Sequence, residues 1–167
     1  MFPPLPEQVE DLEVGRRATV RGEVVPRDLI DSPLTGEPCV YYSYSVEQRR
    51  RSRVGGDAFW DIVEKDEAIL EFYVEDDSGR AIVAPFQARI DRARGIHPVT
   101  HELAMDRQAH ELLIRPGDLI EVTGVVAEVL DLFDEGRSYR GRPERLMLRA
   151  PDGGRMEIRL LRRGPEG

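Results

Sequence analysis

The chain has 167 residues, of which 40% are hydrophobic, and this is enough for one compact domain with its own core. Its formal net charge of -8 opposes non-specific adhesion to nucleic acid or to anionic lipid. The only cysteine, Cys39, excludes an internal disulfide and a zinc site made of four cysteines. A reducing, cytoplasmic compartment is expected, with or without membrane association. Since no run of about 18 apolar residues occurs, we do not expect a membrane-spanning segment.

The first half of the chain begins with a proline-rich stretch, residues 1–15, which predicts an extended lead-in with at most one turn of helix. From Ala18 to Val25 apolar and polar residues alternate, as in a half-buried strand. After a turn-rich loop, Cys39 to Glu47 is rich in valine and tyrosine and predicts a second strand. We expect one face of this strand to contribute to the core, namely Val40, Tyr42, Tyr44 and Val46.

The firmest local prediction is a β-hairpin in the middle of the chain. Ala68 to Val74 and Arg80 to Pro85 read as strands, and Asp76-Asp-Ser-Gly between them is a turn signal. The carboxylates nearby could also bind cations or act in acid/base pairs. Turn chemistry is the better explanation, because Asp side chains hydrogen-bond the backbone of turns and glycine tolerates positive φ.

The second half predicts one helix and three more strands. The helix is expected between Phe86 and Ile114, where Thr100 can cap it and Pro116-Gly117 stops it. Residues 118–130 read as a long strand with a central glycine, at which a barrel strand often bends. Two short strands follow, near residues 145–149 and 156–161, and the tail from residue 162 is expected to be frayed.

These elements predict an all-β fold, or a mostly β fold with one helix, in the form of a small OB-like β-barrel with long loops. The expected organisation is an extended lead-in over residues 1–15, one barrel domain over 16–161 and a disordered tail over 162–167.

Three stretches resemble the GIDE domain, also called the beside-a-membrane domain. They are Ser32-Pro-Leu-Thr-Gly-Glu-Pro-Cys-Val-Tyr-Tyr, Phe72-Tyr-Val-Glu-Asp-Asp-Ser-Gly-Arg-Ala-Ile-Val and Arg115-Pro-Gly-Asp-Leu-Ile-Glu-Val-Thr-Gly. The resemblance spans roughly residues 16–130. That family includes the middle region of mitochondrial RING ubiquitin ligases and bacterial homologues, in which the domain sits beside transmembrane helices.

The resemblance implies an accessory domain, in a bacterial or mitochondrial setting, that binds a partner or senses a signal at a membrane surface. It brings no catalytic residues with it. A RING needs several Cys and His ligands, and one cysteine with three histidines cannot supply them, so ligase activity is not expected.

The candidate binding residues are a basic run and two aromatic residues beyond it. Arginines stand at four of five positions after the second strand, and a Phe-Trp pair follows a Gly-Gly turn. The set is Arg49, Arg50, Arg51, Arg53, Phe59 and Trp60. Three interpretations stay open for the basic run: contact with a membrane or protein, binding of single-stranded nucleic acid, or a merely solvated loop. For Phe59 and Trp60 core packing is favoured, and the alternative is an exposed anchor for a partner.

The remaining chemistry-bearing residues do not indicate catalysis. Cys39 has no basic neighbour to activate it, so burial is expected. His97 and His101 have the i,i+4 spacing of a helical metal site, with His110 farther along, but Pro98 disfavours a helix there. We therefore predict no enzyme activity, no cofactor and no metal. The preferred function is a binding module for a protein partner or assembly, or for an anionic membrane surface. Nucleic-acid binding and a metal-assisted hydrolase are the alternatives.

Overall fold

The computed structural model describes residues 4–51, 54–130 and 144–165, and nearly all regular structure in them is β-strand. The only helical element there is a 3-10 turn at Val9–Asp11. No helix in these ranges has the length and apolar character needed to cross a bilayer. The all-β prediction is confirmed.

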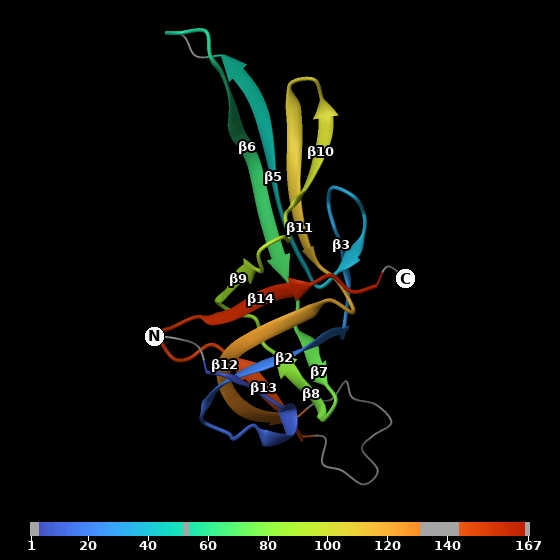
Figure 1. The fold of residues 1–167 in the computed structure, drawn as a ribbon, viewed down its shortest axis with the longest axis vertical. Coiled ribbons are helices and arrows are strands. Elements are labelled where there is room, and N and C mark those ends of the chain that lie inside the picture. Colours follow the sequence, from blue (N-terminus) through green and yellow to red (C-terminus); the bar gives the residue numbers. More distant parts are fainter. Residues whose placement is uncertain (1–3, 52–53, 131–143, 166–167) are drawn as a thin grey trace.

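A closed five-stranded barrel forms the body of the molecule (Figure 1). Around the ring the strands follow the order β2-β7-β8-β13-β12 and return to β2, and only the β8–β13 contact is parallel. In chain order this is first, second, third, fifth, fourth, which is the Greek-key connection of an OB-fold. The barrel strands are β2 (Arg17–Pro26), β7 (Phe72–Asp76), β8 (Gly79–Val83), β12 (Leu119–Leu130) and β13 (Glu144–Arg149).

The core lies inside this barrel. Alternate residues of each strand point inward, so Phe72 and Val74 are fully buried there, as are Ile120 and Val122. Val9 and Leu12 of the lead-in also join the core cluster. The described part of the lead-in, residues 4–15, is extended with one 3-10 turn, as predicted, and it packs on the barrel.

The long strand β12 changes partners at Gly124. Residues 119–123 pair with β14 (Met156–Arg162) and residues 125–130 pair with β13. The glycine at which a bend was predicted is therefore the point where the partner strand changes. The ladder is completed by β9 (Ala88–Arg92), which pairs with β14, and by β1 (Pro6–Glu7), which pairs with β2.

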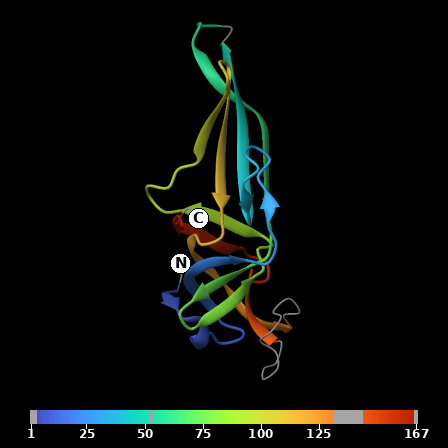
Figure 2. The same cartoon turned by 90° about the vertical axis from the view of Figure 1, so that its right-hand side faces the viewer.

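A second sheet, which we call the arm, projects from one end of the barrel along the long axis of the molecule (Figures 1 and 2). Its strand order is β10-β11-β5-β6. One hairpin is inserted between the first two barrel strands, and the other between the third and fourth. Their bounds are β5 (Tyr41–Arg51), β6 (Ala58–Ile69), β10 (Val99–Ala104) and β11 (Arg107–Ile114). A two-residue ladder, β3 (Ile30–Asp31) with β4 (Pro38–Cys39), lies beside the base of the arm.

The helix predicted between Phe86 and Ile114 is wrong. This segment forms β9, β10 and β11, and the expected capping residue Thr100 lies within strand β10. Helix-favouring residues such as Glu111 and Leu112 are held extended because β11 pairs over its whole length with β5. Tertiary pairing has overridden local propensity.

The core face predicted for the second strand is only half right. Val40 and Val46 are buried, but Tyr42 and Tyr44 are half-exposed, whereas Tyr41 from the opposite face is buried. The reason is that Tyr41, at the start of β5, packs against the barrel core, whereas the rest of β5 lies in the arm. One face of the strand therefore does not face the same core along its whole length.

Candidate interaction surface

The distal end of the arm brings together most of the residues that the sequence singled out. Arg49 lies directly opposite Trp60, Arg50 opposite Phe59, and Arg51 opposite Ala58 in the β5–β6 ladder. Arg49, Arg50 and Arg51 thus belong to strand β5 and not to a loop. Arg53 lies outside the described residues.

Strand alternation divides this set between the two faces of the arm. Cross-strand partners share a face and successive residues point to opposite faces. Arg49, Arg51 and Trp60 therefore lie on one face, which we call the Trp60 face. Arg50 and Phe59 lie on the other, where Arg50 forms an ion pair of 2.9 Å with Asp61. Among the candidate residues that the structure describes, the arginines and aromatic side chains are therefore split between two faces and do not form a single patch.

Large apolar side chains gather at the distal end and are open to solvent, so the expectation that Phe59 and Trp60 pack in the core is wrong. Phe59 is 49% exposed, Trp60 40% and Ile62 58%. Val54 and Met105, in the turns of the two hairpins, are 94% and 95% exposed. We call the exposed apolar group the distal surface, and it comprises Val54, Phe59, Trp60, Ile62, Leu103 and Met105.

The two hairpins meet at this end. The backbone N–H of Arg49 in β5 donates to the carbonyl oxygen of Asp106 in the β10–β11 turn over 2.8 Å. The turn that carries Met105 is thereby tied to the strand that carries the arginines. Segments more than 50 positions apart in the sequence thus meet at the same end of the arm.

Charges at the distal end are mixed. The arginines among the described residues there, Arg49, Arg50, Arg51 and Arg107, stand beside five carboxylates. These are Glu47, Asp57, Asp61, Glu102 and Asp106. A strongly basic patch, as needed for an anionic bilayer, is not formed by these residues.

The histidines do not form a metal site in the described part of the chain. His101 and His110 belong to the same strand pair but lie on opposite faces of the arm. His110 is 2.6 Å from Glu47, and its Nδ1 lies 2.9 Å from Thr100 Oγ1. His101 lies 3.4 Å from Glu111. Among the described residues no group of three or more His, Cys, Asp or Glu side chains is placed to hold a metal ion.

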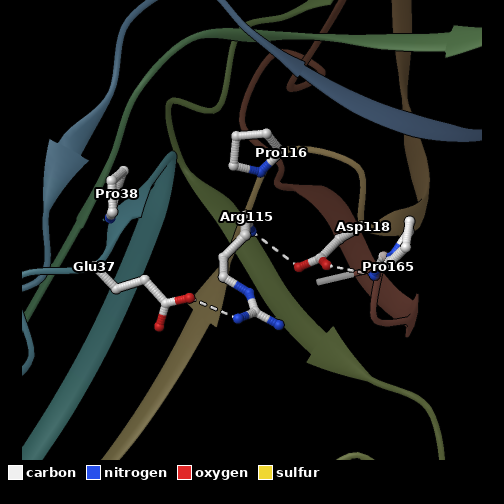
Figure 3. A pocket seen from close by; sticks show the side chains of 7 residues that line it. Glu37, Pro38, Arg115, Pro116, Asp118 and Pro165 are labelled. Carbon is white, nitrogen blue, oxygen red and sulfur yellow. Dashed lines mark hydrogen bonds and ion pairs between the residues drawn. The ribbon is translucent and has the colours of Figure 1, made fainter. Parts of the chain in front are cut away.

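Polar contacts fasten the arm to the barrel around a cleft of about 680 Å³ (Figure 3). Arg115 lies 2.6 Å from Glu37, and its backbone N–H donates to Asp118 over 2.9 Å. Asp118 is almost fully buried and also accepts from Gly164 N at 2.8 Å and Arg163 Nη1 at 3.0 Å. Residues 163 and 164, in the tail expected to be disordered, are thus held in place.

A second buried carboxylate on the Phe59 face, Glu111, accepts hydrogen bonds from the hydroxyls of Ser32 and Thr35 in the loop between β3 and β4. The sequence did not single out Glu37, Glu111, Arg115 or Asp118 as site residues. Two of the stretches that the sequence analysis quoted, 32–42 and 115–124, nevertheless meet here. The side chains in this joint have partners, and we interpret it as the support of the arm.

Cys39 is fully buried, as predicted. Burial, and after it the negative charge of Glu111, raise the pKa of the Cys39 thiol to about 11. A buried thiol with a raised pKa is protonated at neutral pH and is a poor nucleophile.

The outer wall of the barrel carries a cluster that the sequence did not reveal. Three guanidinium groups, from Arg27, Arg80 and Arg145, lie 5.7, 5.0 and 5.7 Å from the ring centre of Tyr73. Tyr73 points away from the core cluster, yet its ring is buried. Two carboxylates balance part of this charge, since Glu71 pairs with Arg27 and Glu75 pairs with Arg80.

Comparison with family models, with curated proteins and with solved structures finds no match. The class that fold and surface define is a small OB-like barrel bearing a projecting β-sheet arm.

Proposed function

We propose that the chain is a non-catalytic interaction module that binds a protein partner through the distal surface of its arm. The observation that carries the proposal is the exposure of Phe59, Trp60 and Ile62 together with the turn residues Val54 and Met105. Exposed apolar side chains scattered singly are ordinary, but a cluster of aromatic and aliphatic side chains at the end of a projection is typical of a binding surface.

The construction of the arm supports this proposal. At its base Glu111 holds the loop between β3 and β4 and Asp118 holds the chain that follows β14, and its two hairpins are joined at the far end. The distal surface is therefore presented on strands that are already ordered. A pre-organised surface loses less conformational entropy on binding than a flexible loop does.

A protein is favoured over an anionic membrane because of the charge at the distal end. The arginines there are matched by carboxylates, and the Arg50–Asp61 ion pair occupies one of them. Mixed charge around apolar and aromatic residues is typical of the rim of a protein interface. The GIDE resemblance, with its membrane-adjacent setting, stays a prediction.

Affinity capture with matched variants tests the proposal. The triple variant Trp60→Ser, Ile62→Ser, Met105→Ser should capture a specific partner at least about tenfold less efficiently than the native chain does, because these side chains supply the apolar contact. The control is Phe86→Ser, which removes an aromatic residue outside the arm that is even more exposed, at 79%, and it should retain the partner.

Partner binding that survives the triple substitution, or that Phe86→Ser abolishes, contradicts the proposal. Co-sedimentation with phosphatidylserine-containing vesicles at physiological salt is expected to be negative. If the chain sediments strongly with these vesicles and the triple substitution abolishes this binding, the distal surface binds a membrane and not a protein partner.

Single-stranded nucleic-acid binding is a second candidate, favoured by the Tyr73 cluster. The outer wall formed by the second and third barrel strands is where OB-folds bind oligonucleotides, and Arg27, Arg80 and Arg145 lie there. Burial of the Tyr73 ring, the carboxylates of Glu71 and Glu75 and the overall charge weaken this candidate. If this candidate is correct, the native chain binds a labelled single-stranded oligonucleotide with an affinity that falls as salt rises, and the Arg145→Ala variant does not bind it.

A further inference from the structure

The outer edge of β6 presents main-chain polar groups to solvent near Trp60. Because the N–H of Arg49 bonds to Asp106 on the β11 side, the polar groups of Arg49 point away from β6. Arg49 and Trp60 are therefore a pair that exchanges no hydrogen bonds with each other, and the N–H and C=O of Trp60 point outward. By alternation, those of Ala58 and Ile62 point outward as well.

The same residues share one face of the strand. Ala58, Trp60 and Ile62 lie at successive alternate positions on the Trp60 face, and all three are exposed or nearly so. An edge segment with outward polar groups and an apolar face is a template for another strand.

The rest of β6 is unsuited to pairing. The ladder shifts register between Val46 and Glu47, which makes Val63 the extra residue of a β-bulge in β6. Beyond it stand Glu64, Lys65, Asp66 and Glu67 in succession. Bulges and charged side chains are the common means by which edge strands resist pairing. The segment open to a partner is therefore short, residues 58–62.

We propose that this segment pairs with the same segment of a second copy of the chain, antiparallel, about a two-fold axis at Trp60. This inference rests on the proposed function and names the partner of the distal surface. In this register Trp60 opposes Trp60 and Ala58 opposes Ile62 of the second copy, so the side chains that the two paired segments place on the Trp60 face are all apolar. The two arms then form one continuous sheet.

Charge favours this occupant and this register. On the opposite face Phe59 meets Asp61 of the second copy, whose charge is already compensated by Arg50 at 2.9 Å. The charged residues 64–67 lie beyond Ala58 of the second copy and so outside the paired segment. No two like charges therefore face each other across the two copies within this segment. An axis at Lys65 would instead set Lys65 against Lys65 and Glu64 against Asp66, which is unfavourable.

The contact is small, so the dimer should be weak. An interface centred on five residues of an edge strand lies at the lower end of the size range of specific interfaces. We expect a dissociation constant on the order of micromolar, with monomer dominant in dilute solution.

Disulfide trapping tests the register with Trp60 left in place. An Ala58→Cys chain mixed with an Ile62→Cys chain should form a crossed dimer, because hydrogen-bonded antiparallel partners have Cα atoms about 5.5 Å apart, within disulfide range. Each chain alone should cross-link at least about tenfold more slowly, since each Cys lies about 14 Å from its own copy. Native Cys39 is buried with a raised pKa and does not compete.

Trp60→Cys extends the test, since this position alone lies on the axis and should cross-link to itself. Equal rates for the mixture and for each chain alone, or no cross-linking of any of them at about 100 micromolar, would overturn the proposed dimer. If cross-linking fails while the triple variant still loses a captured partner, only the second copy is wrong and the proposed function stands. If both fail, the distal surface is not a binding site.

Discussion

The carboxylate of Asp76 joins two distant parts of the chain. It accepts hydrogen bonds from the backbone N–H of Val9 at 2.8 Å, and from Ser78 N and Oγ at 2.8 and 2.6 Å within its own turn. Partial burial alone would raise the pKa of Asp76, but these hydrogen bonds outweigh it and hold the pKa below its ordinary value of 3.8. The turn residues thus also anchor the lead-in to the barrel.

We expect Asp76→Asn to lower the free energy of unfolding at neutral pH by about 1–3 kcal/mol, because hydrogen bonds to a charged acceptor are lost. A carboxyl whose folded pKa is depressed contributes stability above its unfolded pKa, and this contribution is lost as the pH falls through the folded value. The gap between native and variant chains in urea unfolding should therefore narrow below about pH 4. A constant gap down to about pH 2 would contradict this account, and Asp77→Asn, at an exposed neighbour, is the control.

Individual residues were predictable from the sequence where their chemistry is local. The turn role of Asp76 follows from its place at the start of Asp-Asp-Ser-Gly, and the burial of Cys39 follows from its apolar neighbours. The exposure of Trp60 was not predictable, because a large aromatic side chain in a β-rich sequence normally packs in the core. Whether Trp60 is buried depends on whether another layer of the protein covers the arm. Among the described residues no such layer does, and Trp60 is exposed.

At the scale of elements, the close approach of β12 to β13 depends on the absence of a side chain at Gly124. A Cβ at this position would lie 2.6 Å from the carbonyl oxygen of Arg149 in β13, closer than real contacts allow. We expect Gly124→Ala to destabilise the chain by about 1–3 kcal/mol, since the backbone of β13 must shift. The control is Gly55→Ala, where a Cβ meets nothing within 4 Å. Equal thermal unfolding temperatures for the two variants would show that β12 and β13 do not approach closely in solution.

Strands with clear alternation were predictable, and β11 was not. The buried residues of β11 do alternate, as Ala109, Glu111 and Leu113. The middle residue, Glu111, is a carboxylate that is hydrogen-bonded to Ser32 and Thr35. The alternation of buried and exposed positions therefore does not show as an alternation of hydrophobic and polar residues. A strand whose core-facing position is a buried acid reads as helix or loop.

At the scale of the whole molecule, the OB-like barrel could be predicted as a class, because short strands and turn signals in sequence suffice for that. The arm could not be predicted. Its hairpins, β5–β6 and β10–β11, are separate insertions between barrel strands, and their pairing is a long-range contact. The candidate residues could be singled out from the sequence, but their division between two faces became visible only with the register of the β5–β6 ladder.

Site-specific photo-cross-linking tests most directly whether the distal surface is the binding surface. A benzophenone amino acid at Met105, on the distal surface, is compared in the native extract with the same group at Phe86, outside the arm. Both side chains are exposed, so the reactive group is equally accessible at each. We expect discrete protein cross-links from position 105, to a second copy or another protein, and none from position 86. Cross-links from position 86 alone, or from neither position, would contradict the account.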